Sequence, residues 1–189
     1  MKAFVLAEPG KVKWFDAPEP QLVPYGAILK PVAVTPCSSD VHTVFGGGSK
    51  KQDNLVLGHE CIAEVVSVGE NVCDFKTGDR VAVPAITPDW REKSIQEGND
   101  RHASAPFSGH QLGRTQPGVF SERFLIKDAD TTLAHIPQKI SEEQALMSVD
   151  VVTTGFTGAE YADIKIGDTV CVIGIGPIGL MEVQLVLLQ

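Results

Sequence analysis

The 189-residue sequence lacks features that would point to charged polymers or to export. Its 16 Lys and Arg residues stand against 24 Asp and Glu, and the resulting net charge of -8 repels phosphate backbones and anionic lipid surfaces. Nucleic acid is therefore not an expected partner. The amino end contains only the short apolar run 3–7, whereas a secretory signal core needs about 7–15 apolar residues. We therefore predict a cytoplasmic protein.

Cysteine is scarce, and no two cysteines are spaced as C-x-x-C, which argues against a structural zinc knuckle and a thioredoxin-type redox site. Without a secretion signal, disulfides are not expected either. Long apolar runs are also lacking. Residues 170–188 come nearest to a membrane span, but glycines and a proline interrupt them and Glu182 adds a charge, so we predict no span. The four cysteines are Cys37, Cys61, Cys73 and Cys171.

The first 135 residues contain short β-like runs separated by glycine and proline turns, a pattern typical of a β-barrel or sandwich. A proline inside the first of these runs, Pro31, indicates a sheet edge or a bulge. Residues 87–118 are polar without a period and predict a surface lobe of unknown role, in which His110 has no evident partner. The predicted strands are 27–34, 61–68, 81–83 and 120–126.

A different pattern begins after residue 140. Ser141 and Gln144 have the spacing of a capping box, so we predict a helix over 141–149 and a second one over 153–162. Residues 169–173 form a continuous apolar run, which predicts a strand buried on both faces of a parallel sheet, with Cys171 inside it. The helix after this strand is expected over 180–189.

The turn after this strand carries the glycines of a dinucleotide-binding fingerprint, G-x-G-x-x-G, at Gly174, Gly176 and Gly179. Such glycines let the backbone approach a pyrophosphate at the amino end of the next helix. A plain glycine-rich turn between strand and helix is the alternative. The side chain that selects NAD or NADP lies about 20 residues further along in this motif, beyond the sequence given.

Three side chains offer sulfur, nitrogen and oxygen to a metal, namely Cys37, His59 and Asp150. They are too far apart in sequence to form a local metal motif, so His59 taken alone fits a hydrogen-bonded core or turn histidine better than a metal ligand. Asp150 stands among apolar residues, where a carboxylate must be hydrogen-bonded, neutralised or bound to a cation. A helix cap is the alternative for Asp150. Ser39 and His42 form a hydroxyl–imidazole pair that could pass a proton outward.

Taken together, these motifs resemble the medium-chain, zinc-dependent alcohol dehydrogenases, and most closely their NADP-dependent secondary-alcohol branch. The resemblance implies a mainly β GroES-like barrel over residues 1–152, which forms the catalytic zinc domain. It also implies that 153–189 are the start of a Rossmann dinucleotide-binding domain, left incomplete after its first βα unit. The segments that carry the resemblance are 36–42, 58–60, 83–90, 150–156 and 174–179.

The resemblance also implies one catalytic zinc and no structural zinc, with NADP as cofactor and NAD not excluded. A small alcohol, ketone or aldehyde would be the substrate, and a full-length relative would form a homotetramer. By this resemblance, zinc would be bound by Cys37, His59 and Asp150, with Glu60 as a nearby or alternate ligand. Protons would pass through Ser39 and His42. The cofactor would lie against Thr154, Gly174, Gly176, Pro177, Ile178 and Gly179.

Two departures and two alternatives accompany this resemblance. Ala63 replaces a family glycine behind the zinc site, and His110 replaces a tryptophan in the long lobe, which removes an apolar wall from the substrate side. The alternative function is a truncated, non-catalytic paralogue that binds zinc or a protein partner. A zinc-free quinone reductase fits less well, because it has no use for Cys37, His59 and Asp150 together.

Overall fold

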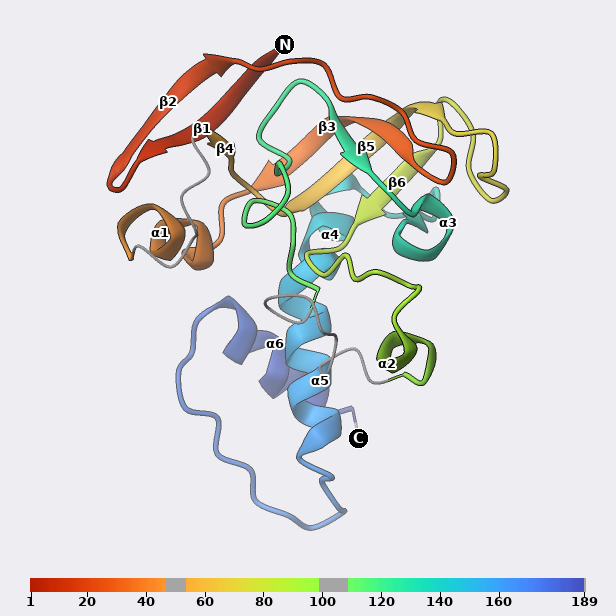
Figure 1. Ribbon diagram of the computed structural model, residues 1–189. Coiled ribbons are helices and arrows are strands. Elements are labelled where there is room, and N and C mark those ends of the chain that lie inside the picture. The colour runs from red at the N-terminus through yellow and green to blue at the C-terminus, as the bar shows by residue number, and fades with distance from the viewer. Residues whose placement is uncertain (47–53, 99–108, 189) are drawn as a thin grey trace.

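The computed structural model describes residues 1–46, 54–98 and 109–188 and contains two antiparallel sheets (Figure 1). The smaller sheet has the order β2-β1-β4 and the larger one the order β7-β3-β5-β6-β8. Their strands are β1 (Lys2–Glu8), β2 (Lys11–Asp16), β3 (Ala27–Thr35), β4 (Leu55–Val56), β5 (Glu60–Val68), β6 (Arg80–Val83), β7 (Phe124–Ile126) and β8 (Ala134–His135).

The sheets are open, so the prediction of a closed barrel is wrong for the described residues. In the larger sheet, the edge strands β7 and β8 lie at opposite ends of the strand order. Each is short: β7 pairs with three residues of β3, and β8 pairs with two residues of β6. Strands of this length cannot supply the continuous, staggered ladder that closure requires.

The long central strand β3 explains the proline in its sequence. β3 pairs with β5 on one side and with β7 on the other, so it is not an edge strand. The register against β5 shifts between Pro31 and Ala33, which is the bulge that a residue without an N–H group favours. The predicted bulge is confirmed; β7 pairs only with residues 27–29, so at Pro31 β3 has β5 as its one paired neighbour among the described strands.

The main core lies against the five-stranded sheet and includes Leu112 from the stretch 87–118, which was predicted to be a surface lobe. Leu112 and Val119, the latter just after this stretch, are both fully buried in this core. The short helix α2 (Lys93–Gln96) belongs to the same stretch, and residues 99–108 of it lie outside the described residues. Buried partners of Leu112 and Val119 include Leu29, Cys61, Val65, Val81, Val83, Phe124 and Ile126.

After β8 the regular elements are helices, and the first of them form one continuous rod (Figure 1). Helix α4 (Glu142–Met147) begins at the predicted capping box, because the Ser141 hydroxyl accepts from Gln144 N and the Gln144 side chain accepts from Ser141 N. A π turn, η2 (Ser148–Val152), joins α4 to α5 (Thr153–Tyr161). The proposed domain boundary at 152/153 therefore falls inside this rod.

The predicted strand over 169–173 is absent from the structure, which describes these residues as an extended, unpaired loop (Figure 1). Cys171 is exposed and Ile173 is 95% exposed, so the prediction that both are buried in a parallel sheet is wrong. A strand forms only where a neighbouring strand satisfies its N–H and C=O groups, and no described strand lies beside this segment.

Helix α6 (Pro177–Val186) follows the loop and begins three residues earlier than predicted, because proline fits the first position of a helix. Its backbone packs against α5 at Gly155, where an added Cβ would lie 2.9 Å from Glu182 N, and the Glu182 side chain packs at Gly158, where an added Cβ would lie 3.0 Å from Oε1. None of the helices in the described residues is both long enough and apolar enough to cross a membrane.

Candidate metal centre

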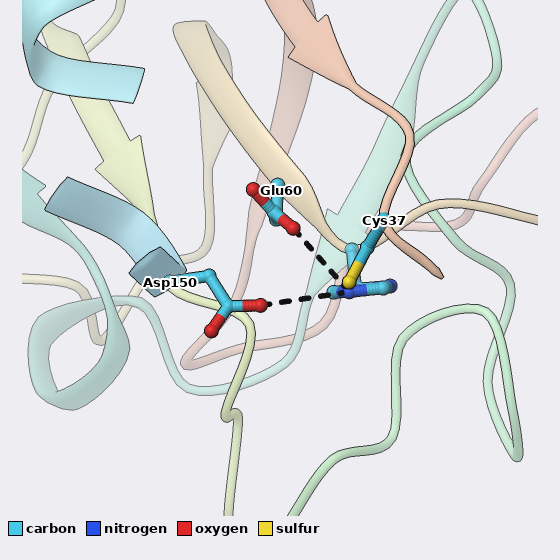
Figure 2. A group of neighbouring side chains, drawn as sticks. Cys37, Glu60 and Asp150 are labelled. Atoms are coloured by element: carbon cyan, nitrogen blue, oxygen red, sulfur yellow. Dashed lines mark ion pairs between the residues drawn. The ribbon is translucent and has the colours of Figure 1, made fainter. Parts of the chain in front are cut away.

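Four side chains from different parts of the chain converge at one point beneath the larger sheet. Each offers one ligand atom, and these atoms all lie within 4.8 Å of one another. Figure 2 shows the side chains of Cys37, Glu60 and Asp150 directed toward the same space, with dashed lines for the two ion pairs to His59. The thiol, imidazole and carboxylate groups are the donors that zinc prefers in catalytic sites.

Local structure explains how these donors are placed. Cys37 is the residue before α1 (Ser38–Phe45), and His59 immediately precedes β5, whose first residue is Glu60. His59 and Glu60 are buried, while Cys37 is only partly buried. The centre therefore has a protein-covered side and a side that is partly accessible to solvent.

Asp40 joins the two segments that carry Cys37 and His59, and the sequence analysis missed it. This buried carboxylate accepts hydrogen bonds from Cys37 N at 2.9 Å and Gly58 N at 3.2 Å. Its Oδ1 lies 3.4 Å from Nδ1 of His59. The only sequence signal was its spacing, since an acid three residues after a helix cap can accept from the cap N–H. Asp40 thereby fixes the His59 ring with Nε2 toward the cluster.

The charges of the cluster shift the pKa values of its buried members. Burial would raise the pKa of Asp40, but hydrogen bonds from His59, Cys37 and Gly58 keep it below its usual range. Burial likewise favours neutral His59, but Asp40 and Cys37 outweigh it and raise the pKa of His59 to about 9. Burial and the charge of Asp150 raise the pKa of Glu60 to about 7. The negatively charged donors thus repel one another, and a bound cation would offset this repulsion.

Asp150 lies in the π turn η2 and not at a helix cap, so the cap alternative is wrong. A π turn widens the helix locally and is often found at functional sites. Here it presents Asp150 toward the sheet, with Oδ2 3.9 Å from Nε2 of His59, while Glu60 Oε1 lies 3.7 Å from the same nitrogen.

The two residues predicted to move protons lie on α1. Ser39 Oγ is 3.4 Å from Nε2 of His59, so the structure brings this hydroxyl to the cluster. His42 is exposed one turn further along α1. The helix thus carries one residue of the pair at the metal centre and the other at the surface.

The amino-acid pattern of residues 24–138 matches the family model described as "Alcohol dehydrogenase GroES-like domain". The chain belongs to this family. Its GroES-like portion therefore includes β3 to β8, the Cys37 loop and His59, whereas Asp150 comes from the helical rod that follows.

Relatives of this GroES-like chain are dehydrogenases by name. The chain is 51% identical over 183 residues to the "NADP-dependent isopropanol dehydrogenase" of Thermoanaerobacter brockii. The aligned part covers 97% of this chain and 52% of that protein. The protein of the same name from Clostridium beijerinckii is 46% identical over the same shares. The chain thus spans about half the length of the curated relatives it matches.

Solved structures agree with this assignment. The chain superposes on the apo form of "Zinc dependent alcohol dehydrogenase 2 from Streptococcus pneumonia" with a TM-score of 0.88 and 30% identity, covering 100% of this chain and 53% of that chain. Alcohol dehydrogenase TADH from Thermus sp. ATN1 gives a TM-score of 0.88 with 26% identity, covering 100% and 55%.

The glycine motif of the GroES-like chain forms a tight turn at the amino end of α6. Gly174 has φ +99°, which favours glycine, and an added Cβ at Gly179 would lie 1.9 Å from the Gly174 carbonyl oxygen. Together with Pro177, Ile178 and Glu182, these glycines line a hollow of about 310 Å³. Free amides at the start of a helix can hold a phosphate, so this hollow could receive a pyrophosphate.

His110, for which the sequence offered no partner, packs against the metal centre. Its ring lies edge-on to the ring of His59, with 4.4 Å between centroids. The Nε2 atom of His110 is buried without a hydrogen-bond partner among the described residues, and burial, with the charge of His59, lowers the pKa of His110 to about 4. The substitution noted in the long lobe therefore places a neutral imidazole beside a candidate metal ligand.

Proposed function

We propose that this chain supplies the catalytic metal centre of a zinc-dependent oxidoreductase that interconverts secondary alcohols and ketones, or aldehydes, with a nicotinamide cofactor. The observation that carries the proposal is the convergence of Cys37, His59, Glu60 and Asp150 within 4.8 Å. Relatives named as NADP-dependent isopropanol dehydrogenases support the same chemistry.

In this proposal Cys37, His59 and Asp150 hold one zinc, and Glu60 is a nearby or alternate ligand. The donor set fits, because mixed sulfur, nitrogen and oxygen ligands leave an open position in catalytic zinc sites. When bound, zinc supplies Lewis acidity toward the substrate oxygen. Asp40 keeps His59 oriented, since its carboxylate lies 3.4 Å from Nδ1 and leaves Nε2 for the metal.

Ser39 is proposed to accept the alcohol proton and pass it outward, because its hydroxyl lies at the cluster. His42, exposed on the same helix, would release that proton to water. Hydride transfer itself belongs to the cofactor, and the chain's contribution is to orient the reacting groups.

The cofactor is proposed to be NADP, with NAD not excluded. The amides at Gly174, Gly176 and Gly179, with Pro177 and Ile178, would receive its pyrophosphate, and Thr154 would lie near the nicotinamide ring. The names of the relatives support NADP. A small alcohol, ketone or aldehyde is the proposed substrate, in a cytoplasmic homotetramer. Residues 1–152 and 153–189 would form the catalytic and the dinucleotide-binding parts.

The proposal is tested by the zinc content of the purified 189-residue chain. We expect one zinc per wild-type chain and nearly none in Cys37→Ser, because loss of the thiolate opens the ligand set. Cys73→Ser is the matched control, since Cys73 is exposed and outside the cluster. Two zincs per wild-type chain, or unchanged zinc in Cys37→Ser, would refute the ligand assignment.

The alternative, a chain that binds zinc without turnover, is separated from the enzyme by a second assay. We expect residues 1–189 alone to reduce butan-2-one very slowly with NADPH or NADH, because the loop 169–173 is outside any sheet and the cofactor needs a crevice at strand ends. Joining the chain to the carboxyl-terminal half of the Thermoanaerobacter brockii relative should restore turnover. A zinc-loaded, folded chimera without turnover would favour the non-catalytic paralogue.

A further inference from the structure

The two oxygens of the Asp150 carboxylate have different surroundings. Oδ1 accepts a hydrogen bond of 2.7 Å from the Thr154 hydroxyl, four residues further along the rod. Oδ2 is the oxygen that lies toward His59, 3.9 Å from Nε2. One oxygen is therefore engaged by the chain itself while the other faces the metal centre.

The Thr154 bond departs from what threonine hydroxyls usually do in helices. Such a hydroxyl commonly donates to a backbone carbonyl three or four residues earlier. Thr153 does so to the Asp150 carbonyl at 2.8 Å, and Thr157 does so to the Thr153 carbonyl at 2.8 Å. Thr154, between them in the same helix, donates to a carboxylate instead. Residues four apart lie on the same face of a helix, which puts the Asp150 carboxylate within reach of this hydroxyl.

We infer that Thr154 is a positioning residue of the metal centre, whose hydroxyl holds Oδ1 of Asp150 so that Oδ2 is presented to the metal. The inference rests on the proposed function, because it takes Asp150 to be a ligand. Asp150 is partly exposed, with 19% of its side chain accessible, so without Thr154 the carboxylate could rotate toward water. Hydrogen bonds from outer residues hold ligating carboxylates in this way, and their loss weakens metal binding by about 10–100-fold.

The same bond limits how Thr154 can meet a cofactor. A hydroxyl has one proton to donate, and this proton is directed to Asp150. Thr154 can then offer a nicotinamide only its oxygen lone pairs, as an acceptor. A hydrogen bond between Thr154 and a cofactor is therefore compatible with metal positioning only if the cofactor donates it.

The test measures zinc affinity of the 189-residue chain by competition with a chromophoric chelator, together with the visible spectrum of the cobalt(II)-loaded chain. We expect Thr154→Val to weaken zinc binding by about 10–100-fold and to alter the cobalt spectrum. Thr154→Ser, which keeps the hydroxyl, should restore both. Thr153→Val is the matched control, because its hydroxyl reaches only a backbone carbonyl.

The outcomes separate this inference from the proposed function. A wild-type chain that binds no zinc would refute the proposed metal centre. Tight zinc binding by the wild type with equal affinity in Thr154→Val would refute the positioning role alone. An equal loss in Thr153→Val would assign the effect to helix stability and would also overturn it. Should Thr154→Val fail to fold by circular dichroism, Thr154→Ala against Thr153→Ala makes the same comparison.

Discussion

The two sheets and the segment 163–188 are both rich in apolar residues. The sheets bury large apolar side chains, whereas the segment leaves such side chains exposed to water. In the sheet region, Leu29 and Ile62 are fully buried. In the later segment, Ile166 and Ile173 are almost wholly exposed. Apolar character stabilises a protein only where another surface removes it from water. The sheets provide that surface, whereas the described part of the later segment packs through α6 against α5 and η2 and leaves its other side in water.

Glycine shows the same contrast. Gly58, beside the metal centre, has φ +89°, and an added Cβ would lie 2.4 Å from the Phe120 ring. Gly176, in the dinucleotide motif, has ordinary backbone angles and nothing within 4 Å of an added Cβ. Packing therefore requires glycine at position 58, while nothing in the described residues requires glycine at position 176.

The largest expected effect follows from that contrast. Gly58→Ala should lower the free energy of unfolding by about 2–5 kcal/mol, because backbone strain and overpacking add. Gly176→Ala should change it by less than about 0.5 kcal/mol. Urea unfolding of the two variants measures both values. Equal losses would show that the segment 163–188 is packed as tightly as the sheets.

A second pair of variants compares carboxylates that hold backbone amides. Asp40→Asn should cost about 2–4 kcal/mol, because Asp40 is buried and holds two N–H groups beside His59. Asp168→Asn should cost less than about 1 kcal/mol, since its carboxylate accepts from Lys165 N at an exposed turn. The measurement is again urea unfolding, with zinc removed by chelator. A larger loss in Asp168→Asn would reverse the comparison.

The stability of the sheet region should also depend on pH through His59. In the metal-free chain the pKa of His59 is raised to about 9. Protonated His59 then stabilises the fold fully below the unfolded pKa of about 6.5, and this stability is lost as pH rises through about 9. Urea midpoints should fall between pH 6.5 and 9.5 with chelator present. With zinc bound to Nε2 the fall should vanish; its persistence would separate His59 from the metal.

The smallest expected effect on stability belongs to the exposed loop. Ile173→Lys should change the free energy of unfolding by less than about 0.5 kcal/mol, but it should weaken self-association of the chain, because exposed apolar side chains favour contact between copies. Light scattering after size exclusion at several concentrations measures this. Val32→Lys, at a half-exposed position of β3, is the control. A wild-type chain that stays monomeric would refute the expectation.

Local patterns predicted the elements that local chemistry controls. The capping box at Ser141 placed the start of α4 within one residue, and Pro31 marked the bulge in β3. The prediction of a strand over 169–173 was wrong, because an apolar run forms a strand only beside a neighbouring strand, and the described residues contain none there. The prediction that Cys171 is buried was wrong for the same reason, since a side chain is buried only where other residues cover it.

The sequence by itself determined which donors the chain carries, where α4 is capped and which turn needs glycine, because these depend on neighbours a few residues apart. Only the tertiary structure decided that Cys37, His59 and Asp150 meet, that Asp40 holds two of the segments together and that His110 lies against His59. These contacts join residues far apart in the chain, so a pattern of neighbouring residues cannot predict the contacts. Sheet pairing and the packing of the helical rod bring the residues together.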